Sequence, residues 1–342
     1  MFHYRRVALT LIAAGALAFT TTGVPAAFAA DADATQASSS QQAGDDSPST
    51  IIVQLDARDD GVDRAVYYAQ MKKRIGEAVA AASPGSTISD VRDYLHAFDG
   101  FAIQAPASTL TAIRSTAGVK GAFLDGYNTF VTDEEINGQY RAAAGGGDSG
   151  ITSGAAARMM RANAATQKGQ GQVIELIDSG IDTSHEAFAG TMDTAALRLP
   201  QAEMESLTSQ LDAGQGGAWV SDKIPFVYDY ADRDTNPSIG YGYGPQDYTV
   251  HAHGTRMAAL AAANGATYQG SAPDAQLILA KVLSNSTWTV RDSDLLAALD
   301  DAMVLKPDTV CVSFMANRDL EGEASALYDD VFARLSGAGI TV

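Results

Sequence analysis

The stretch QVIELID, residues 172–178, is an apolar run that ends in an acid, Asp178, and is followed by SGID. Its length and its β-branched residues predict a strand, and the glycine after it allows the chain to turn. Three similar runs follow, accompanied by helical patterns at 254–264, 290–303 and 324–335. Alternating strands and helices predict an α/β domain whose parallel sheet is covered by helices on both faces. The other predicted strands are KIPFVYDY (223–230), QLILAKVL (276–283) and DTVCVSFM (308–315).

The N-terminus has the pattern of an export signal. Basic residues in MFHYRR precede VALTLIAAGALAF, which is too short for a comfortable membrane span, and AFA then supplies the small residues of a cleavage site. We therefore expect a signal peptide over residues 1–29 and a secreted protein. Residues 30–50 are rich in Ala, Ser, Gln and Asp, and this composition predicts a disordered linker.

Residues 51–131 predict a separate, small α+β domain. The patterns follow one another as a strand, a helix, two strands that turn at Asp99-Gly100, a second helix and a last strand. Ser108 is the expected N-cap of the second helix. The order β-α-β-β-α-β predicts a ferredoxin-like fold. The segments are IIVQL, DRAVYYAQMKKRIGEAVAAA, ISDVRDYLHAFDGFAIQAP, ASTLTAIRSTAG and VKGAFLDGYNTFV.

Two polar segments flank the first strand of the α/β domain. Residues 132–170 connect the two domains and contain three consecutive glycines, 145–147, which suit either a plain linker or a processing site. Residues 191–222 predict a partly helical surface insertion.

Asp178 and His253 are the candidate catalytic pair. Asp178 ends its strand at the sheet edge where parallel α/β domains form their sites. His253 stands directly before the helical pattern, so we expect it at the head of that helix. A carboxylate bound to one ring nitrogen fixes the tautomer and leaves the other nitrogen able to act as a general base. The alternative is that His251 and His253 form half of a metal site, although the sequence holds no matching Cys/His cluster to complete it.

The stretch HAHGTRMAAL, residues 251–260, permits two interpretations. Arg256 replaces either the Ser of a Gly-Thr-Ser-Met-Ala nucleophile motif or the second His of a His-Gly-Thr-His motif. The segment GSAPDAQLILAKVL that follows at 270–283 favours the histidine motif. With VIELIDSGIDTSHEAF at 173–188, these motifs resemble the subtilases, the subtilisin-like serine proteases. The order of Asp before His agrees with that of subtilisin.

The resemblance covers nearly the whole chain and implies a function for each part. It implies that Asp178 orients His253, the general base in hydrolysis of protein or peptide substrates. Residues 51–131 resemble a subtilisin propeptide, which acts in the family as an intramolecular chaperone and inhibitor. DTVCVSFMAN resembles the strand and turn that line the substrate cleft, which places Ser313 and Phe314 near substrate. KIPFVYDYADRDTNPS before the histidine motif is similar to the cell-envelope, lactocepin-like branch, and association with the cell wall is left open.

Three departures from the family pattern concern activity. Arg256 puts a permanent cation near His253, which opposes the imidazolium of the transition state. Ala187 stands where the family has the acidic ligand of a calcium site, so calcium is left open and no other cofactor is evident. No Gly-Thr-Ser occurs in the 342 residues. We expect the family's Ser and oxyanion Asn to lie beyond Val342, and residues 171–342 to be a partial catalytic domain, inactive alone.

Composition excludes several classes of partner. The net charge of -18 and the pI near 4.5 oppose binding to nucleic acid or to an anionic membrane surface. The single cysteine, Cys311, permits no intrachain disulfide, and its apolar surroundings predict a buried structural thiol. Two other functions fit the sequence. One is a non-catalytic binding protein on a degenerate protease scaffold, and the other is a secreted protease inhibitor that acts through residues 51–131.

Overall fold

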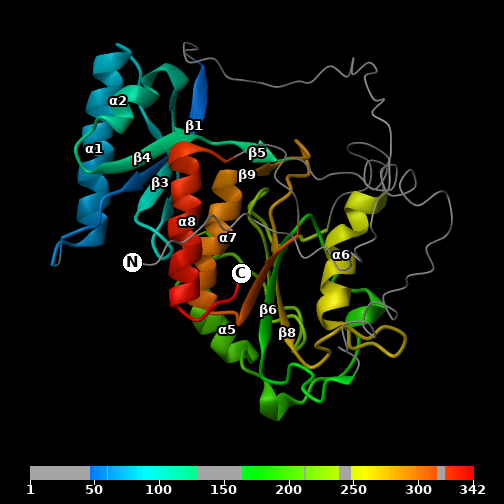
Figure 1. Cartoon of the computed structure of the whole chain (residues 1–342). Coiled ribbons are helices and arrows are strands. Elements are labelled where there is room, and N and C mark those ends of the chain that lie inside the picture. Colours follow the sequence, from blue (N-terminus) through cyan, green and yellow to red (C-terminus); the bar gives the residue numbers. More distant parts are fainter. Residues whose placement is uncertain (1–46, 60, 129–163, 212, 239–247, 314–319) are drawn as a thin grey trace, which may run out of the picture.

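The computed structural model describes residues 47–59, 61–128, 164–211, 213–238, 248–313 and 320–342, without the side chains of 248–252. Two sheets organise them, and helices α7 and α8 lie between these sheets (Figure 1). The predicted signal peptide, most of the predicted linker, most of the 132–170 connection and Phe314 lie outside the described residues.

The N-terminal sheet has the strand order β2-β3-β1-β4, and every neighbouring pair is antiparallel. The predicted β-α-β-β-α-β order is present. Its elements are β1 (Pro48–Leu55), α1 (Arg64–Ala82), β2 (Ser89–Tyr94), β3 (Gly100–Pro106), α2 (Leu110–Arg114) and β4 (Val119–Leu124).

Helix α1 covers one face of this sheet. It begins after Asp63, whose side chain accepts a hydrogen bond from the Val66 N–H and so satisfies one of the unpaired donors of the first turn. Apolar residues at helical spacing then form a core with alternate residues of β1 and β3. That core contains Tyr68, Met71, Ile75 and Val79 of the helix and Ile51, Val53, Phe101 and Ile103 of the strands.

Details of this unit correct the sequence predictions. β1 begins at Pro48, which pairs with Pro106, so the end of the predicted 30–50 linker belongs to the sheet. Ser108 is not the N-cap of an α-helix, because it lies inside a 3₁₀ turn, Ala107–Thr109, and α2 begins only at Leu110. The Thr109 hydroxyl donates to the Pro106 carbonyl within that turn. A proline-led 3₁₀ turn has therefore replaced the expected first helical turn.

The last predicted strand of this unit, residues 119–131, is interrupted. β4 ends at Leu124, and β5 (Tyr127–Asn128) leaves the sheet to pair with β9 (Val290–Arg291). At this interruption the turn between β4 and β5 forms hydrogen bonds with the start of α7. There the Asp125 carboxylate accepts hydrogen bonds from the Ser293 N–H and hydroxyl, at 2.9 and 2.7 Å.

The second sheet has the order β10-β6-β8-β7, with every neighbouring pair parallel. The four predicted strands are present as β6 (Val173–Asp178), β7 (Phe226–Asp229), β8 (Gln276–Lys281) and β10 (Thr309–Val312). Helix α6 (Tyr248–Ala262) covers one face, and α7 (Asp292–Leu305) and α8 (Gly322–Gly337) cover the other (Figure 1). The prediction of an α/β architecture is confirmed, and the carboxyl ends of the strands meet at one edge.

The polar segment 191–222 contributes to the core and is more than a surface insertion. It contains a 3₁₀ turn, Thr194–Ala196, and helix α5 (Gln201–Thr208). Met204 and Leu211 are each 1% exposed and belong to the core that contains α7. Leu199 belongs to the same core, and because polar residues separate these apolar ones, the sequence pattern did not show their burial.

The N-terminal unit docks through the face of its sheet that α1 does not cover. Because side chains alternate along a strand, Ile52 points away from the α1 core and joins the core of the second unit. The docked face meets α7 and α8 (Figure 1). This shared core includes Ile52, Tyr94, Ala102 and Phe123 on one side and Ala324, Leu327, Tyr328 and Val331 on the other.

Polar contacts surround this apolar contact. Asp300 of α7 accepts hydrogen bonds from three consecutive backbone N–H groups after β2, those of Leu95, His96 and Ala97, at 2.9, 2.9 and 2.6 Å. Asp125 supplies the start of α7 with a carboxylate from the other unit, which suits the positive end of the helix dipole. The two units are thus joined by hydrogen bonds that are specific in direction as well as by apolar burial.

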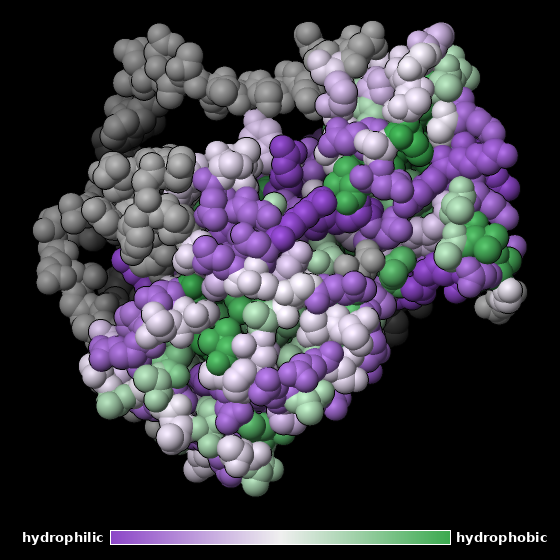
Figure 2. Space-filling model, turned by 180° about the vertical axis from the view of Figure 1, so that it is seen from behind, coloured by the Kyte–Doolittle hydropathy of each residue, from purple (hydrophilic) through white to green (hydrophobic). Residues whose placement is uncertain are grey.

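The described helices and the rear surface were searched for a membrane span and for a large apolar patch. No helix among the described residues is long and apolar enough to cross a membrane. Figure 2 shows mostly hydrophilic and neutral residues on the rear face, with hydrophobic residues in small separate groups.

Cys311 is half-buried beside the α6 core, and burial raises the pKa of its thiol. This protonated, packed thiol agrees with the predicted structural role, although its burial is incomplete.

Glu175, inside the predicted apolar run, gives the parallel sheet a pH-dependent stability. It is 0% exposed, neither carboxyl oxygen has a hydrogen-bond partner among the described residues, and burial, with a smaller effect of Asp301, raises its pKa well above the usual value. A group whose pKa is higher in the folded state stabilises the fold at low pH, and this contribution is lost as the pH rises above the unfolded pKa.

We expect Glu175→Gln to remove this loss. The decline in the free energy of unfolding between about pH 5 and about pH 8 should be smaller than in the wild type by about 1.4 kcal/mol for every unit of pKa shift expressed in that interval. Urea denaturation at the two pH values measures it, and Glu203→Gln, at an exposed site, is the matched control. Parallel pH profiles for wild type and Glu175→Gln would contradict the expectation.

Candidate active site

Asp178 is the last residue of β6 and is fully buried at the carboxyl edge of the sheet. Its Oδ1 accepts hydrogen bonds from the Ser179 N–H at 2.6 Å and the Ser179 hydroxyl at 3.1 Å. The same oxygen lies 2.8 Å from Nδ1 of His253. The bonds from Ser179 fix the orientation of the carboxyl group toward the histidine ring.

His253 lies in α6, and its side chain is 30% exposed. The hydrogen-bonding distance expected from the sequence between His253 and Asp178 is present. With Asp178 ionised, the tautomer that satisfies both groups carries its proton on Nδ1 and donates it to Oδ1. Nε2 is then the ring atom that can accept a proton. The pair therefore has the geometry of a general base held by a carboxylate.

Helix α6 begins six residues before the predicted start at Gly254, so His253 is inside the helix and not at its head. Gly254 marks a close approach and not a helix start. A Cβ there would lie 2.4 Å from the Gly180 carbonyl oxygen and 3.0 Å from Asp178 Oδ1. In addition, the Thr255 hydroxyl accepts from the Asp182 N–H at 2.9 Å. The missing side chain lets α6 approach the turn after β6, which brings His253 to Asp178.

The alternative metal site receives no support from this helix. His251 and His253 are two residues apart on α6, and side chains at this spacing do not face each other on an α-helix. The side chain of His251 lies outside the described residues. Within the described part of the chain, no group of three His, Cys, Asp or Glu residues could hold a metal ion.

The residues around Ala187 do not fit the calcium site that the family resemblance leaves open. Ala187 is buried, and its carbonyl accepts hydrogen bonds from the N–H groups of Asn264 and Gly265, at 2.9 and 3.0 Å. Its own N–H donates to Nδ1 of His185. The backbone is thus already bonded within the protein, and no acidic side chain is present at this position to serve as a ligand.

Of the two predicted substrate-binding residues, the structure describes one. Ser313 follows β10 at the edge where Asp178 ends β6, and its N–H lies 3.4 Å from the Ile177 carbonyl oxygen. It is half-buried. Phe314 lies outside the described residues. Arg256 is exposed and lies three residues after His253, a spacing that places two side chains on one side of a helix.

A buried ion cluster that was not predicted from the sequence lies at the same sheet edge. Lys281 ends β8 beside Asp178, and its Nζ lies 2.5 Å from Asp229 Oδ2, 3.2 Å from Asp232 Oδ2 and 2.5 Å from the Leu283 carbonyl oxygen. Burial raises the pKa of Asp229 to about 6 although Lys281 opposes this shift. A lysine inside the apolar run QLILAKVL was the available signal. The cluster fixes the turns after β7 and β8 next to the candidate pair.

Comparison with known proteins gives this site its context. A chain from Lactococcus lactis subsp. cremoris, the PI-type proteinase, is 31% identical over 154 residues, which cover 43% of this chain and 8% of the relative. The C5a peptidase of Streptococcus pyogenes is 26% identical over 184 residues, covering 51% of this chain and 15% of the relative. Each match therefore spans only a small part of the relative.

Among solved structures, fervidolysin from Fervidobacterium pennivorans, described as a keratinolytic enzyme related to subtilisin, is similar at 14% identity with a TM-score of 0.47, over 85% of this chain and 39% of that chain. The family model described as Subtilase family matches residues 169–338, the region that contains the parallel sheet, Asp178 and His253. Through this region the chain belongs to the subtilase family.

Proposed function

We propose that the chain is part of a secreted subtilisin-like serine endopeptidase precursor. In this proposal Asp178 orients His253, His253 is the general base, and the serine nucleophile comes from outside these 342 residues. The observation that carries the proposal is the 2.8 Å contact between Asp178 Oδ1 and His253 Nδ1 at the carboxyl end of β6. It occurs in a region that matches the subtilase family.

The arrangement supports a defined proton path. Nε2 of His253 takes the proton of a serine hydroxyl as that oxygen attacks the substrate carbonyl, and later gives this proton to the leaving amine. The buried Asp178 carboxylate holds Nδ1–H and stabilises the imidazolium that exists between the two steps. Because Asp178 is fully buried, its charge acts on the ring with little screening by water.

Peptides are the proposed substrates. Ser313 continues β10 at the edge that holds Asp178, which suits a role of the adjoining backbone in binding an extended peptide. The printed names of the relatives, a proteinase and a C5a peptidase, agree with this class of substrate. Ser313 is the proposed contact that the structure describes, and Phe314 remains a proposed one.

Residues 51–131, of which the structure describes all up to Asn128 except residue 60, are the proposed propeptide of this precursor. Their support is the docked sheet face, which shares an apolar core with α7 and α8, and the three hydrogen bonds received by Asp300. A unit bound in this way can assist folding of the second sheet and remain as an inhibitor. The export pattern of residues 1–29 supports secretion of the precursor.

Hydrolysis by the full-length product of the gene tests the proposal. His253→Ala should abolish both cleavage of a fluorogenic casein and labelling by a fluorophosphonate, which reacts with an activated serine. His251→Ala is the matched control, because the proposal needs only one of the two histidines, whereas a metal site built on H-x-H needs both. Wild-type rates in His253→Ala, or equal losses in the two variants, would overturn the proposed catalytic pair.

A further inference from the structure

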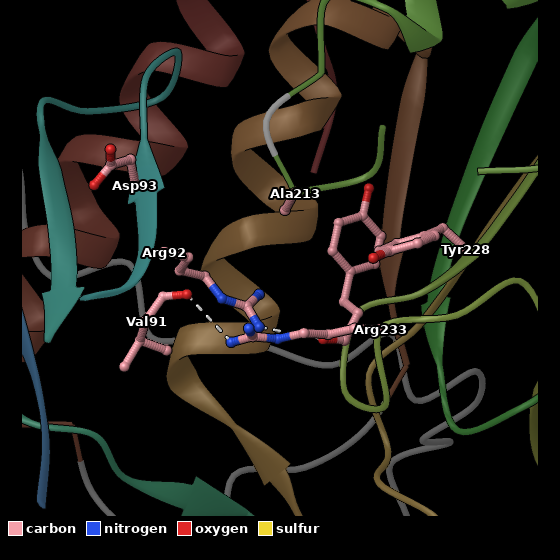
Figure 3. Close-up of a pocket in the computed structure, with 7 residues that line it drawn as sticks. Val91, Arg92, Asp93, Ala213, Tyr228 and Arg233 are labelled. Carbon is pink, nitrogen blue, oxygen red and sulfur yellow. Dashed lines mark hydrogen bonds between the residues drawn. The ribbon is translucent and has the colours of Figure 1, made fainter. Parts of the chain in front are cut away.

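A cavity of about 240 Å³ lies where the N-terminal unit meets the turns around β7. Strand β2 forms one wall, and β7 with residues before and after it forms the other (Figure 3). This volume equals that of about eight water molecules, enough for a small ion with part of its hydration shell. The lining residues are Val91, Arg92, Asp93, Ala213, Tyr228, Tyr230 and Arg233.

Two arginines, one from each unit, meet in this cavity. Arg92 donates from Nη2 to the Tyr230 carbonyl at 3.3 Å, and Arg233 donates from Nη2 to the Val91 carbonyl at 3.4 Å. Each side chain thus bonds the backbone beside the other, and Figure 3 shows the two guanidinium groups converging. Two permanent cations this close repel each other unless negative charge lies between or beside them.

Burial opposes the charge of Arg92, but the acids beside it, Asp294 and Asp125, raise its pKa overall. Asp294 pairs with Arg92 at 2.6 Å. Asp93 also lines the cavity, but its carboxylate lies 2.7 Å from Lys72 Nζ and points away from the arginines in Figure 3. Of the three charged residues that line the cavity, two are arginines, and the one acid, Asp93, is held by Lys72.

Arg92 has hydrogen-bonding capacity that the protein does not use. Its side chain is 8% exposed, and its buried Nε and Nη1 atoms have no hydrogen-bond partner among the described residues. Buried guanidinium donors without acceptors are costly, and charged oxygen acceptors are the groups that satisfy them best. Arg233 is exposed at the mouth of the cavity, so an ion can enter from solvent.

We propose that this cavity binds a small oxyanion, a phosphate or a carboxylate, between Arg92 and Arg233. The bound anion lies against the two guanidinium groups and screens the two cations from each other. Because each unit supplies one arginine, the site is complete only when the N-terminal unit is docked. Anion binding therefore stabilises the docked state, and docking raises the affinity for the anion. The inference is independent of the proposed peptidase activity.

Binding of inorganic phosphate and of succinate to the 342-residue chain tests this site. Calorimetric titrations and thermal unfolding are run with each anion against chloride at matched ionic strength. We expect saturable binding of at least one oxyanion and a higher Tm than in chloride. The two arms identify whether the site prefers phosphate or a carboxylate. Absence of saturable binding of both anions at up to about 10 mM, where nearly all of a site with a Kd of 1 mM would be filled, would overturn the proposal.

Arg233→Gln is the informative variant, because replacing Arg92 would also leave Asp294 unpaired in a buried position. It should weaken anion binding by about tenfold or more, the usual effect of losing one charge-assisted hydrogen bond. Lys73→Gln, which removes the same charge from an exposed site on α1, should leave binding unchanged. Equal weakening by both variants would show nonspecific attraction and overturn the site. If Arg233→Gln does not fold, the readout is hydrogen exchange at residues 91–93 of the wild type. This exchange should be slower in the presence of the anion than in chloride, and equal rates would overturn the site.

Discussion

Asp300→Ala is expected to undock the N-terminal unit from α7. The substitution removes the carboxylate that accepts from the backbone N–H groups of Leu95, His96 and Ala97 and leaves three donors without this partner at a partly buried contact. A buried donor left unsatisfied costs about 1–3 kcal/mol, and a part-buried one costs less, so docking should weaken by about 3 kcal/mol for the three together. That loss is a factor of about 100 in the docking equilibrium.

Hydrogen exchange on the intact chain measures this effect. Protection at 95–98 should fall sharply in Asp300→Ala, whereas protection in the α1 core, which does not use this contact, should remain. Asp329→Ala is the control, because Asp329 is an exposed acid on α8. If 95–98 stay protected in Asp300→Ala to the level of the control, the three hydrogen bonds do not hold the units together.

Asp178→Asn should lower kcat for peptide hydrolysis by about 10⁴-fold in the full-length gene product. An amide has no charge to stabilise the imidazolium, and its NH₂ group can donate to Nδ1 of His253. Donation to Nδ1 forces the ring proton onto Nε2, so the atom that should act as the base is blocked. Because the amide retains the shape of the carboxylate, KM and the fold should change little.

Steady-state kinetics with a fluorogenic peptide separate these effects. A fall in kcat at nearly constant KM supports a role for Asp178 in the transition state, and circular dichroism checks that the fold is retained. Asp182→Asn, at an exposed acid in the turn after β6, is the matched control. A kcat for Asp178→Asn within about tenfold of the wild type would exclude the role proposed for this carboxylate.

The strands and the candidate pair could be predicted because their signals are local. Long apolar runs identify β6 and β8, and an acid at the end of one run together with a histidine motif identifies Asp178 and His253. The predicted start of α6 was wrong because glycine weakens a helix and therefore favours a boundary at Gly254. Gly254 is instead needed for the close approach to Gly180, a neighbour that is distant in sequence.

Other features could not be read from local patterns because their partners lie far along the chain. Lys281 is costly in an apolar strand until Asp229 and Asp232 are brought beside it by the parallel pairing of β7 and β8. Asp300 likewise acquires its role only when the turn after β2 packs on α7. Neither pattern reports a tertiary partner. The sequence therefore predicts the frame of the site better than the contacts that support it.

The pairing of β6 with β10 has a kinetic consequence. Ile174 meets Thr309 in this parallel pair, whereas every strand pair of the first sheet joins residues between Pro48 and Leu124. Contacts between residues distant in sequence require closure of long loops before they give any stabilisation, and folding slows as such contacts come to dominate a topology. The first sheet is thus expected to form earlier. Its preformed face would then bind α7 and α8. This binding would reduce the loop-closure entropy that must be lost before β10 pairs with β6 in the correct register.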